Sequence, residues 1–324
     1  MRRISLRVLD ALLLLWLVTT LTFALLHLAP GDPATLLIAP TATADEAAQL
    51  RATLGLDASL PVQYARWIGG LLRGDLGTSL VRSLPVRTVI AESLPISVFL
   101  GGISLLISFV LGTVAGLVQA LRVGPRADRW LSLISVTVYA APSFWLALAL
   151  VALFTSGVAV LGLPDGVRLP AFGMQSPSSG GTADWSDRWR HAVLPLLVLS
   201  IPGAAGVARY ARQTLRTAAS APYVTSAYAR GLSRARVEWR YILRSALTPL
   251  VVLLGLTLPG VIAGSVFVEQ VFAWPGLGRA MLSAIGARDY PVVLGLTLVY
   301  AGTVVLANLL ADLALWWLDP RRRH

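Results

Sequence analysis

Six long runs of apolar residues, separated by polar segments, are the main feature of the sequence, and each reaches the roughly 20 residues that a helix needs to cross a bilayer. The runs are Leu9–Ala29, Leu94–Leu121, Trp130–Leu161, Ala192–Leu215, Ala246–Phe272 and Val292–Leu318. They are too long for the strands of a membrane β-barrel, in which apolar and polar residues alternate over about ten residues. Because a bilayer accepts only helices or closed barrels, the pattern predicts an all-α membrane protein with six transmembrane helices.

The polar segment between the first two runs, residues 30–92, contains helix signals of its own. Thr43 and Glu46 have the spacing of a capping box, in which each side chain bonds the backbone of the other residue. Gly55 is a typical residue at which the helix opened by Thr43 would end. The segment is therefore expected to have structure of its own.

A second helix in this segment is predicted to begin at Pro61 and to be amphipathic, because its aromatic and aliphatic residues recur at helical spacing on one face. That face can pack on the membrane or on neighbouring transmembrane helices. It can also form a docking surface for an external partner, for which the candidate contacts are Tyr64, Trp67 and Asp75.

Residues 216–244, between the fourth and fifth runs, are basic and carry signals for two short helices. Ser220 can cap the first helix, with Pro222 in its first turn, and Ser233 can cap the second. Gly231 interrupts the helical pattern between them. The pattern predicts a projecting knob that is bent at the glycine, and it fits equally an amphipathic loop whose arginines touch anionic lipid.

The composition supports the membrane assignment and excludes several kinds of chemistry. Apolar residues make up 56% of the 324 residues and charged residues only 13%, against about 25% charged in soluble domains. The absence of Cys excludes disulfides, iron–sulfur clusters and a thiolate nucleophile. All 27 basic residues are Arg, so the chain lacks the Lys of a Walker-type ATPase, and its three His are too far apart for a His-pair zinc motif. No metal site or cofactor is therefore expected in this chain.

The distribution of arginine predicts the orientation. The termini and the loops on their side of the membrane carry 17 of the 27 Arg, and the opposite loops carry 10. With the acidic residues included, the two sides sum to +12 and −1. The positive-inside rule then places both termini and residues 216–244 in the cytoplasm. Because topology accounts for the high positive charge, no nucleic-acid partner is expected.

The runs carry no charged residue near their middle, which counts against an ion-driven transporter. Glu269 and Asp312 fall near the ends of runs, where contact with interfacial water is expected. Proline and glycine are frequent in the runs, as in the broken helices around a transport path, although such residues are common in membrane helices generally. Candidate residues of such a path, each of which can equally be packing, are Tyr139, Pro142, Ser143, Trp145, Pro202, Thr257 and Pro259.

Five sequence blocks, spread in order along the chain, match a known pattern. They are Leu28–Ala34, Gly69–Ser79, Pro142–Leu146, Tyr223–Pro249, and Val271–Gly278 followed by Ala287–Pro291. These blocks resemble the permease subunits of dipeptide, oligopeptide and nickel ABC importers, and the long segment after the first run resembles the first of the two permeases in such systems. The resemblance covers essentially the whole chain.

The resemblance implies a type I ABC importer permease fold in a bacterial inner membrane. It implies a second homologous permease, two ATPase subunits or domains that hold ATP and Mg, and an external substrate-binding protein as partners, besides membrane lipid. Di- or oligopeptides are the expected cargo, with nickel, glutathione, opines and sugars as alternatives. With the runs, it divides the chain into residues 1–29 (N-terminus and first helix), 30–92 (external segment), 93–318 (permease core) and 319–324 (basic tail).

The resemblance also implies that residues 216–244 are the coupling segment, which docks on a cytoplasmic ATPase. The general signature there is Glu-Ala-Ala, three residues and Gly; here Thr225, Ser226 and Ala227 precede Gly231, so the acidic residue is missing. The expected contacts are Tyr223, Ala227, Tyr228, Gly231, Leu232 and Ser233. Two alternatives remain open, an ATP-independent secondary transporter or channel, and a membrane anchor without a transport role.

Overall fold

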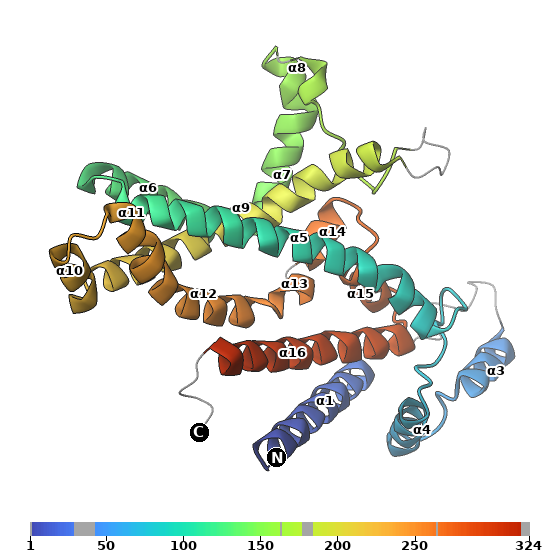
Figure 1. The fold of residues 1–324 in the computed structure, drawn as a ribbon. Coiled ribbons are helices and arrows are strands. Elements are labelled where there is room, and N and C mark those ends of the chain that lie inside the picture. The colour runs from blue at the N-terminus through green and yellow to red at the C-terminus, as the bar shows by residue number, and fades with distance from the viewer. Residues whose placement is uncertain (1, 29–42, 163, 177–183, 264, 319–324) are drawn as a thin grey trace. The chain divides into compact units, whose positions relative to one another are not determined.

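The computed structural model describes residues 2–28, 43–162, 164–176, 184–263 and 265–318, and these are mostly helical (Figure 1). The described part contains no β-strand, only an isolated bridge between Thr78 and Pro85. Most of the block Leu28–Ala34 and the whole basic tail, residues 319–324, lie outside the described residues. The chain forms two compact units, residues 1–96 with 275–305, and residues 97–274 with 306–324.

Among the described residues, six helical stretches are long and apolar enough to cross a membrane, as the sequence predicted. They are Leu9–Leu28, Val86–Leu121, Ser143–Val160, Trp185–Ala219, Arg234–Thr257 and Tyr290–Leu313. They belong to α1 (Arg2–Leu28), α5 (Val86–Leu121), α7 (Ser143–Ala152) with α8 (Val158–Val160), α9 (Trp185–Ala219), α11 (Arg234–Val237) with α12 (Arg244–Thr257), and α16 (Tyr290–Leu318). The described fold is thus an all-α membrane protein.

The third run is not the single helix that was predicted from Trp130 to Leu161. The helix α6 (Pro125–Ala140) ends at Ala141, whose backbone is extended with φ −67° and ψ 129°. The helix α7 then begins directly after Pro142. A residue that precedes proline is disfavoured in the helical conformation, which explains the break at this place.

The predicted bounds of the fifth membrane helix, Ala246 to Phe272, are also wrong. Its helix begins earlier, because α11 continues through a π-helical turn, Glu238–Leu243, directly into α12. It ends at Thr257, before Pro259, and is followed by the short helices α13 (Gly260–Ala263) and α14 (Val266–Val271).

In the first unit, the predicted capping box opens α3 (Ala44–Leu54). The Thr43 hydroxyl accepts from the Glu46 amide at 3.3 Å, and the Glu46 carboxylate accepts from the Thr43 amide at 2.8 Å. Gly55 ends the helix with φ +69°, in the left-handed region that suits glycine. The unit also contains α15 (Leu277–Gly286).

The amphipathic helix α4 (Leu60–Leu72) packs on α1, which was one of its two expected roles. The rings of Tyr64 and Trp67 lie 5.2 and 6.0 Å from the ring of Phe23. The Tyr64 hydroxyl is also hydrogen-bonded to that of Thr20 at 2.6 Å. The stripe of aromatic residues on α4 is therefore used inside the unit.

In the second unit, α5 meets α9 through a row of small residues that recur every fourth position: Ser108, Gly112 and Gly116, all buried. A Cβ atom on Gly112 would lie 2.6 Å from the carbonyl oxygen of Ala204, and one on Gly116 would lie 2.7 Å from that of Ala208. Small residues at this spacing allow two membrane helices to approach until their backbones touch.

Glu269 in α14 contradicts the prediction that it contacts interfacial water. Its side chain is fully buried, and its carboxylate accepts hydrogen bonds from the hydroxyls of Ser97 at 2.7 Å and Ser265 at 2.6 Å. A buried carboxylate is tolerated where donors surround it, so Glu269 joins the start of α14 to α5.

Candidate functional site: the segment between α9 and α12

The predicted arrangement of helix, glycine and helix is present after α9. The helix α10 (Pro222–Ala229) begins with Pro222 at its first position and Ala221 as its N-cap. Ser220 does not cap α10 as predicted, because it ends α9 and its hydroxyl donates to the Thr217 carbonyl at 3.0 Å. A proline at the first position needs no amide partner, so α10 can start without a capping side chain.

Gly231 makes the bend between α10 and α11. Its φ is +77°, and its amide donates to the Tyr228 carbonyl at 2.9 Å, while the Leu232 amide donates to the Ala227 carbonyl at 3.3 Å. A Cβ atom on Gly231 would meet nothing within 4 Å. A glycine is therefore needed here because the backbone has a positive φ, and not because a larger side chain would clash.

An apolar cluster fixes both short helices to the neighbouring long helices. Its buried members come from α9, α10, α11, the π-helical turn and α12, and they are Ala211, Leu215, Ala218, Val224, Ala227, Val237, Ile242, Ala246 and Leu250. Ala227 is fully buried and Leu232 packs against the cluster, so these two predicted contact residues face inward. Ser233 holds the N-cap position of α11, but its hydroxyl makes no capping bond.

Three aromatic residues of the segment remain outside this cluster, whereas Tyr241 packs against it. Tyr223 is 41% exposed, Tyr228 44% and Trp239 67%. The exposed arginines Arg230 and Arg236 lie on the same segment. The segment, residues 216–244, thus combines an apolar base with an aromatic and basic outer surface.

A carboxylate in the π-helical turn connects the segment to α5. Glu238, whose side chain is 8% exposed, accepts from Arg122 at 2.6 Å and from Arg234 at 2.7 Å. Arg234 also donates to the Leu121 carbonyl, the last residue of α5, at 2.8 Å. The Tyr223 hydroxyl adds a bond to the Ser245 hydroxyl at 2.8 Å. These bonds therefore attach the base of the segment to the end of α5.

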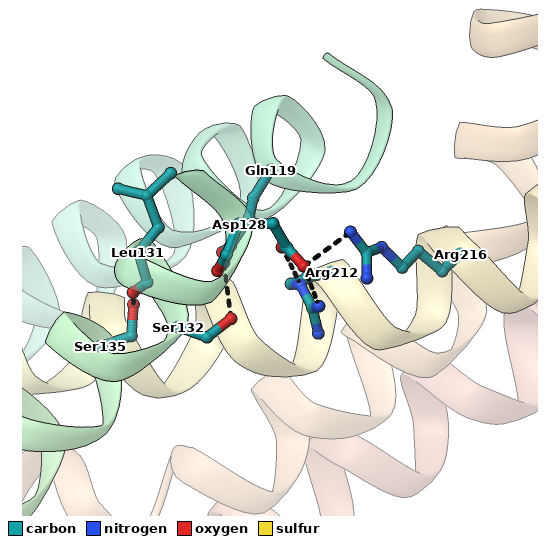
Figure 2. Close-up of polar contacts among 7 residues, drawn as sticks. All are labelled: Gln119, Asp128, Leu131, Ser132, Ser135, Arg212 and Arg216. Atoms are coloured by element: carbon teal, nitrogen blue, oxygen red, sulfur yellow. Dashed lines mark hydrogen bonds and ion pairs between the residues drawn. The ribbon is translucent and has the colours of Figure 1, made fainter. Parts of the chain in front are cut away.

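A second carboxylate, Asp128 of α6, connects α6 to α9 (Figure 2). It receives two hydrogen bonds from Arg212, at 2.6 and 2.5 Å, and a contact from Arg216 at 3.0 Å. Gln119 of α5 donates to the Asp128 carbonyl at 3.1 Å and to the Ser132 hydroxyl at 2.9 Å. The hydrogen bonds from Arg212, more than any other factor, lower the pKa of Asp128 from 3.8 to about 2.

Sequence reasoning did not identify either carboxylate, although a signal for them exists. The predicted cytoplasmic side has 17 Arg and only five acidic residues, and Asp128 and Glu238 are two of those five. An acidic residue in such a basic surrounding is expected to be paired.

Comparison with known proteins identifies the family. The family described as binding-protein-dependent transport system inner membrane component matches residues 108–324, and the family of its N-terminal part matches residues 1–101. The chain belongs to this family. It is thus a transport subunit and, with its six apolar helices, a multi-pass inner membrane component.

Full-length relatives support the assignment. A Brucella ovis protein named as a peptide permease is 38% identical over 320 residues, 97% of each chain. The oligopeptide transport system permease protein AppB of Bacillus subtilis is 33% identical over 305 residues, 94% of this chain and 93% of its own. The dipeptide transport system permease protein DppB of Escherichia coli is 33% identical over 319 residues, 95% and 94% of the two chains.

The candidate path residues of this transport subunit lie at three places, of which two are breaks between helices and one is inside α9. Four lie around the break between α6 and α7: Tyr139, Pro142, Ser143 and Trp145. The Arg209 guanidinium of α9 lies 5.9 Å from the Tyr139 ring centre. Pro202 is inside α9, and Pro259 lies between α12 and α13. Thr257 donates its hydroxyl to carbonyls of its own helix. Their role in a path stays a prediction.

The candidate residues for contact with an external binding protein all make contacts within the chain. Tyr64 and Trp67 pack on α1, and the Asp75 carboxylate accepts from the Gly77 amide at 2.9 Å in the turn that follows α4. Asp75 is nonetheless exposed. Contact of these residues with a binding protein stays a prediction.

The Asp128 cluster gives a testable pH dependence. Because the fold lowers the pKa of Asp128 from 3.8 to about 2, the ionised carboxylate stabilises the fold above pH 3.8, and this stabilisation is lost as the pH falls toward 2. Asp128→Asn should therefore lower the thermal unfolding midpoint equally at pH 7 and pH 5. The difference from wild type should shrink only below about pH 4. A difference that disappears between pH 7 and pH 5 would contradict this assignment.

Proposed function

We propose that this chain is the permease subunit of an ATP-driven, binding-protein-dependent importer of di- or oligopeptides. Two observations support the proposal: the family that matches residues 108–324, and relatives named for peptide transport that align over 93% or more of their length. A second, homologous permease would complete the path, because six helices are few to enclose a passage for a peptide.

The coupling role is supported by the way in which residues 216–244 are attached to the long helices. Their apolar base is buried against α9 and α12, and Glu238 connects them to the end of α5. A cytosolic ATPase that binds the aromatic and basic outer surface could therefore tilt these long helices when it closes on ATP. Such a movement, between two differently packed arrangements, would open the path alternately to each side.

The charge distribution supports an orientation with the coupling segment and both termini in the cytoplasm. In this arrangement the ATPase subunits, with ATP and Mg, act on the arginine-rich side, and a substrate-binding protein delivers cargo on the opposite side. The external segment that contains α3 and α4 then lies where the binding protein would dock.

The alternatives differ in how well they are supported. Family membership does not favour an ATP-independent transporter or channel, nor an anchor without a transport role. The named relatives favour peptides over nickel, glutathione, opines or sugars as the cargo. A direct test is binding of radiolabelled dipeptide to the partner binding protein, followed by ATP-dependent uptake into proteoliposomes that contain the whole importer.

A single exposed residue tests the ATPase contact within that assay. Tyr228→Ala removes an aromatic side chain that is 44% exposed and belongs to no described hydrogen bond or apolar cluster. Loss of an aromatic residue at the centre of an interface weakens association by about 2 kcal/mol or more, so uptake and ATPase co-purification should fall at least roughly tenfold. Phe172→Ala, at an aromatic residue that is 63% exposed outside the segment, is the matched control. Normal ATPase binding by Tyr228→Ala would contradict the proposed contact.

A further inference from the structure

A groove with a strongly positive lining lies beside the Asp128 cluster, at the start of α6. It has a volume of about 600 Å³, and its polar lining consists of Asp128, Arg129, Ser132, Arg212 and Arg216. Figure 2 shows Asp128 between the guanidinium groups of Arg212 and Arg216, with Ser132 on the next turn of α6. Three arginines therefore share this groove with a single carboxylate, which leaves a net charge of +2.

The arginines retain capacity to bind an anion after they have bound Asp128. Arg212 contacts both carboxylate oxygens, whereas Arg216 contacts Asp128 through Nη2 and remains 40% exposed. Arg129 lines the groove and is exposed. A guanidinium group carries five N–H donors, and clusters of such groups suit phosphate oxygens, which accept several hydrogen bonds at once.

An apolar stripe continues the groove along the same face of α6. Leu133 and Val136 follow Arg129 and Ser132 at helical spacing, and their side chains are 54% and 43% exposed. Trp130, 66% exposed, lies at the start of the same helix, where an aromatic residue suits the membrane interface. A free phosphate ion would occupy only the charged end of this surface, whereas a phospholipid would cover both ends.

We propose that this groove is a binding site for an anionic membrane phospholipid, with its phosphate on Arg129 and Arg216 and its acyl chains along Leu133 and Val136. Basic pockets beside transmembrane helices on the cytoplasmic side are suited to such headgroups. The site rests on the proposed orientation, in which the start of α6 faces the cytoplasm. A bound lipid would join α6 to α9 at the place where Asp128 already connects them.

Native mass spectrometry of the full-length chain in detergent tests the site. Phosphatidylglycerol and phosphatidylcholine with identical acyl chains are added at increasing concentration. We expect one phosphatidylglycerol to bind at least tenfold more tightly than phosphatidylcholine. Arg129→Gln should weaken this binding at least threefold, while the control Arg126→Gln, one turn earlier on α6 and outside the groove, should change it less than twofold.

Other outcomes would overturn the proposal. Equal affinity of the chain for the two lipids would show only diffuse attraction between lipid and a basic surface. The same conclusion would follow if Arg129→Gln and Arg126→Gln weakened the binding of phosphatidylglycerol equally. Displacement of phosphatidylglycerol by an equal concentration of inorganic phosphate would assign the groove to a free anion.

A second measurement shows whether lipid or protein covers the apolar stripe in the assembled importer. Because the chain has no Cys, a fluorophore on Leu133→Cys labels this position alone in the chain, and the labelled chain is then assembled with its partners. Quenching by phosphatidylglycerol with brominated acyl chains, stronger than by brominated phosphatidylcholine, is expected. Absence of quenching would mean that another subunit covers the stripe, and it would refute the site. Neither measurement depends on ATP or uptake, so the lipid site can fail while the proposed transport function holds.

Discussion

Gly231→Val is expected to reduce ATP-dependent uptake by the assembled importer about 5- to 30-fold while the chain still inserts in the membrane. The reason is the φ of +77° at this residue, which a β-branched side chain adopts only with strain. A left-handed conformation costs a residue with a Cβ roughly 1–2 kcal/mol, which corresponds to this factor in the population of the bent segment. The measurement is uptake of labelled peptide in proteoliposomes, normalised to the amount of inserted chain.

Gly231→Asn is the matched control, because asparagine tolerates left-handed backbone far better than valine does. A Cβ atom has open space at this position, so neither substitution introduces a clash. The asparagine variant should therefore retain uptake within about twofold. Equal loss in both variants would mean that the bend is not what matters at this position.

Gly112→Ala is expected to destabilise the fold by about 1–3 kcal/mol or more, which is the usual penalty for overpacking. The added methyl group would lie 2.6 Å from the Ala204 carbonyl oxygen, which is backbone and cannot turn aside. The helices α5 and α9 would have to separate along their row of small residues. A lower thermal unfolding midpoint of the purified chain in detergent measures this effect.

Gly102→Ala, on the same helix, is the control for this prediction. A Cβ atom there would meet nothing within 4 Å, and alanine is the better helix former by about 0.5–1 kcal/mol. The unfolding midpoint of this variant should be equal to or above that of the wild type. If both variants have the same unfolding midpoint, then α5 and α9 do not approach each other as closely as described.

The number of membrane helices was predictable from the sequence because each apolar run is a strong signal about 20 residues long. The places where helices break were not. Pro95, Pro195 and Pro202 stay inside continuous helices, whereas the chain breaks at Pro142 and Pro259. The residue type is the same in both cases, so the surrounding packing decides whether a proline bends or ends a membrane helix.

The local structure of residues 216–244 was also predictable, since a first-turn proline and a left-handed glycine act through their own backbones. Its attachment to the rest of the chain was not. Asp128 and Arg212 are 84 positions apart, and Arg122 and Glu238 are 116 apart. No pattern in one sequence tells which arginine meets which carboxylate.

The environment of Glu269 could not be predicted from the sequence either. Its position near the end of an apolar run suggested interfacial water, because the run was expected to be one helix. The break at Pro259 lets α14 turn inward instead, and the donors that make burial tolerable, Ser97 and Ser265, include one from a distant part of the sequence.

The central claim is that the outer surface of residues 216–244 binds a cytosolic ATPase, and single-cysteine crosslinking tests it most directly. The natural chain has no Cys, so Tyr228→Cys places one thiol on the exposed surface and Ala227→Cys places one in the buried base. In membranes that contain the complete importer, we expect a short crosslinker to join Tyr228→Cys, and not Ala227→Cys, to the ATPase. A thiol at position 228 that reacts only from the external side, or that never crosslinks to the ATPase, would contradict the claim.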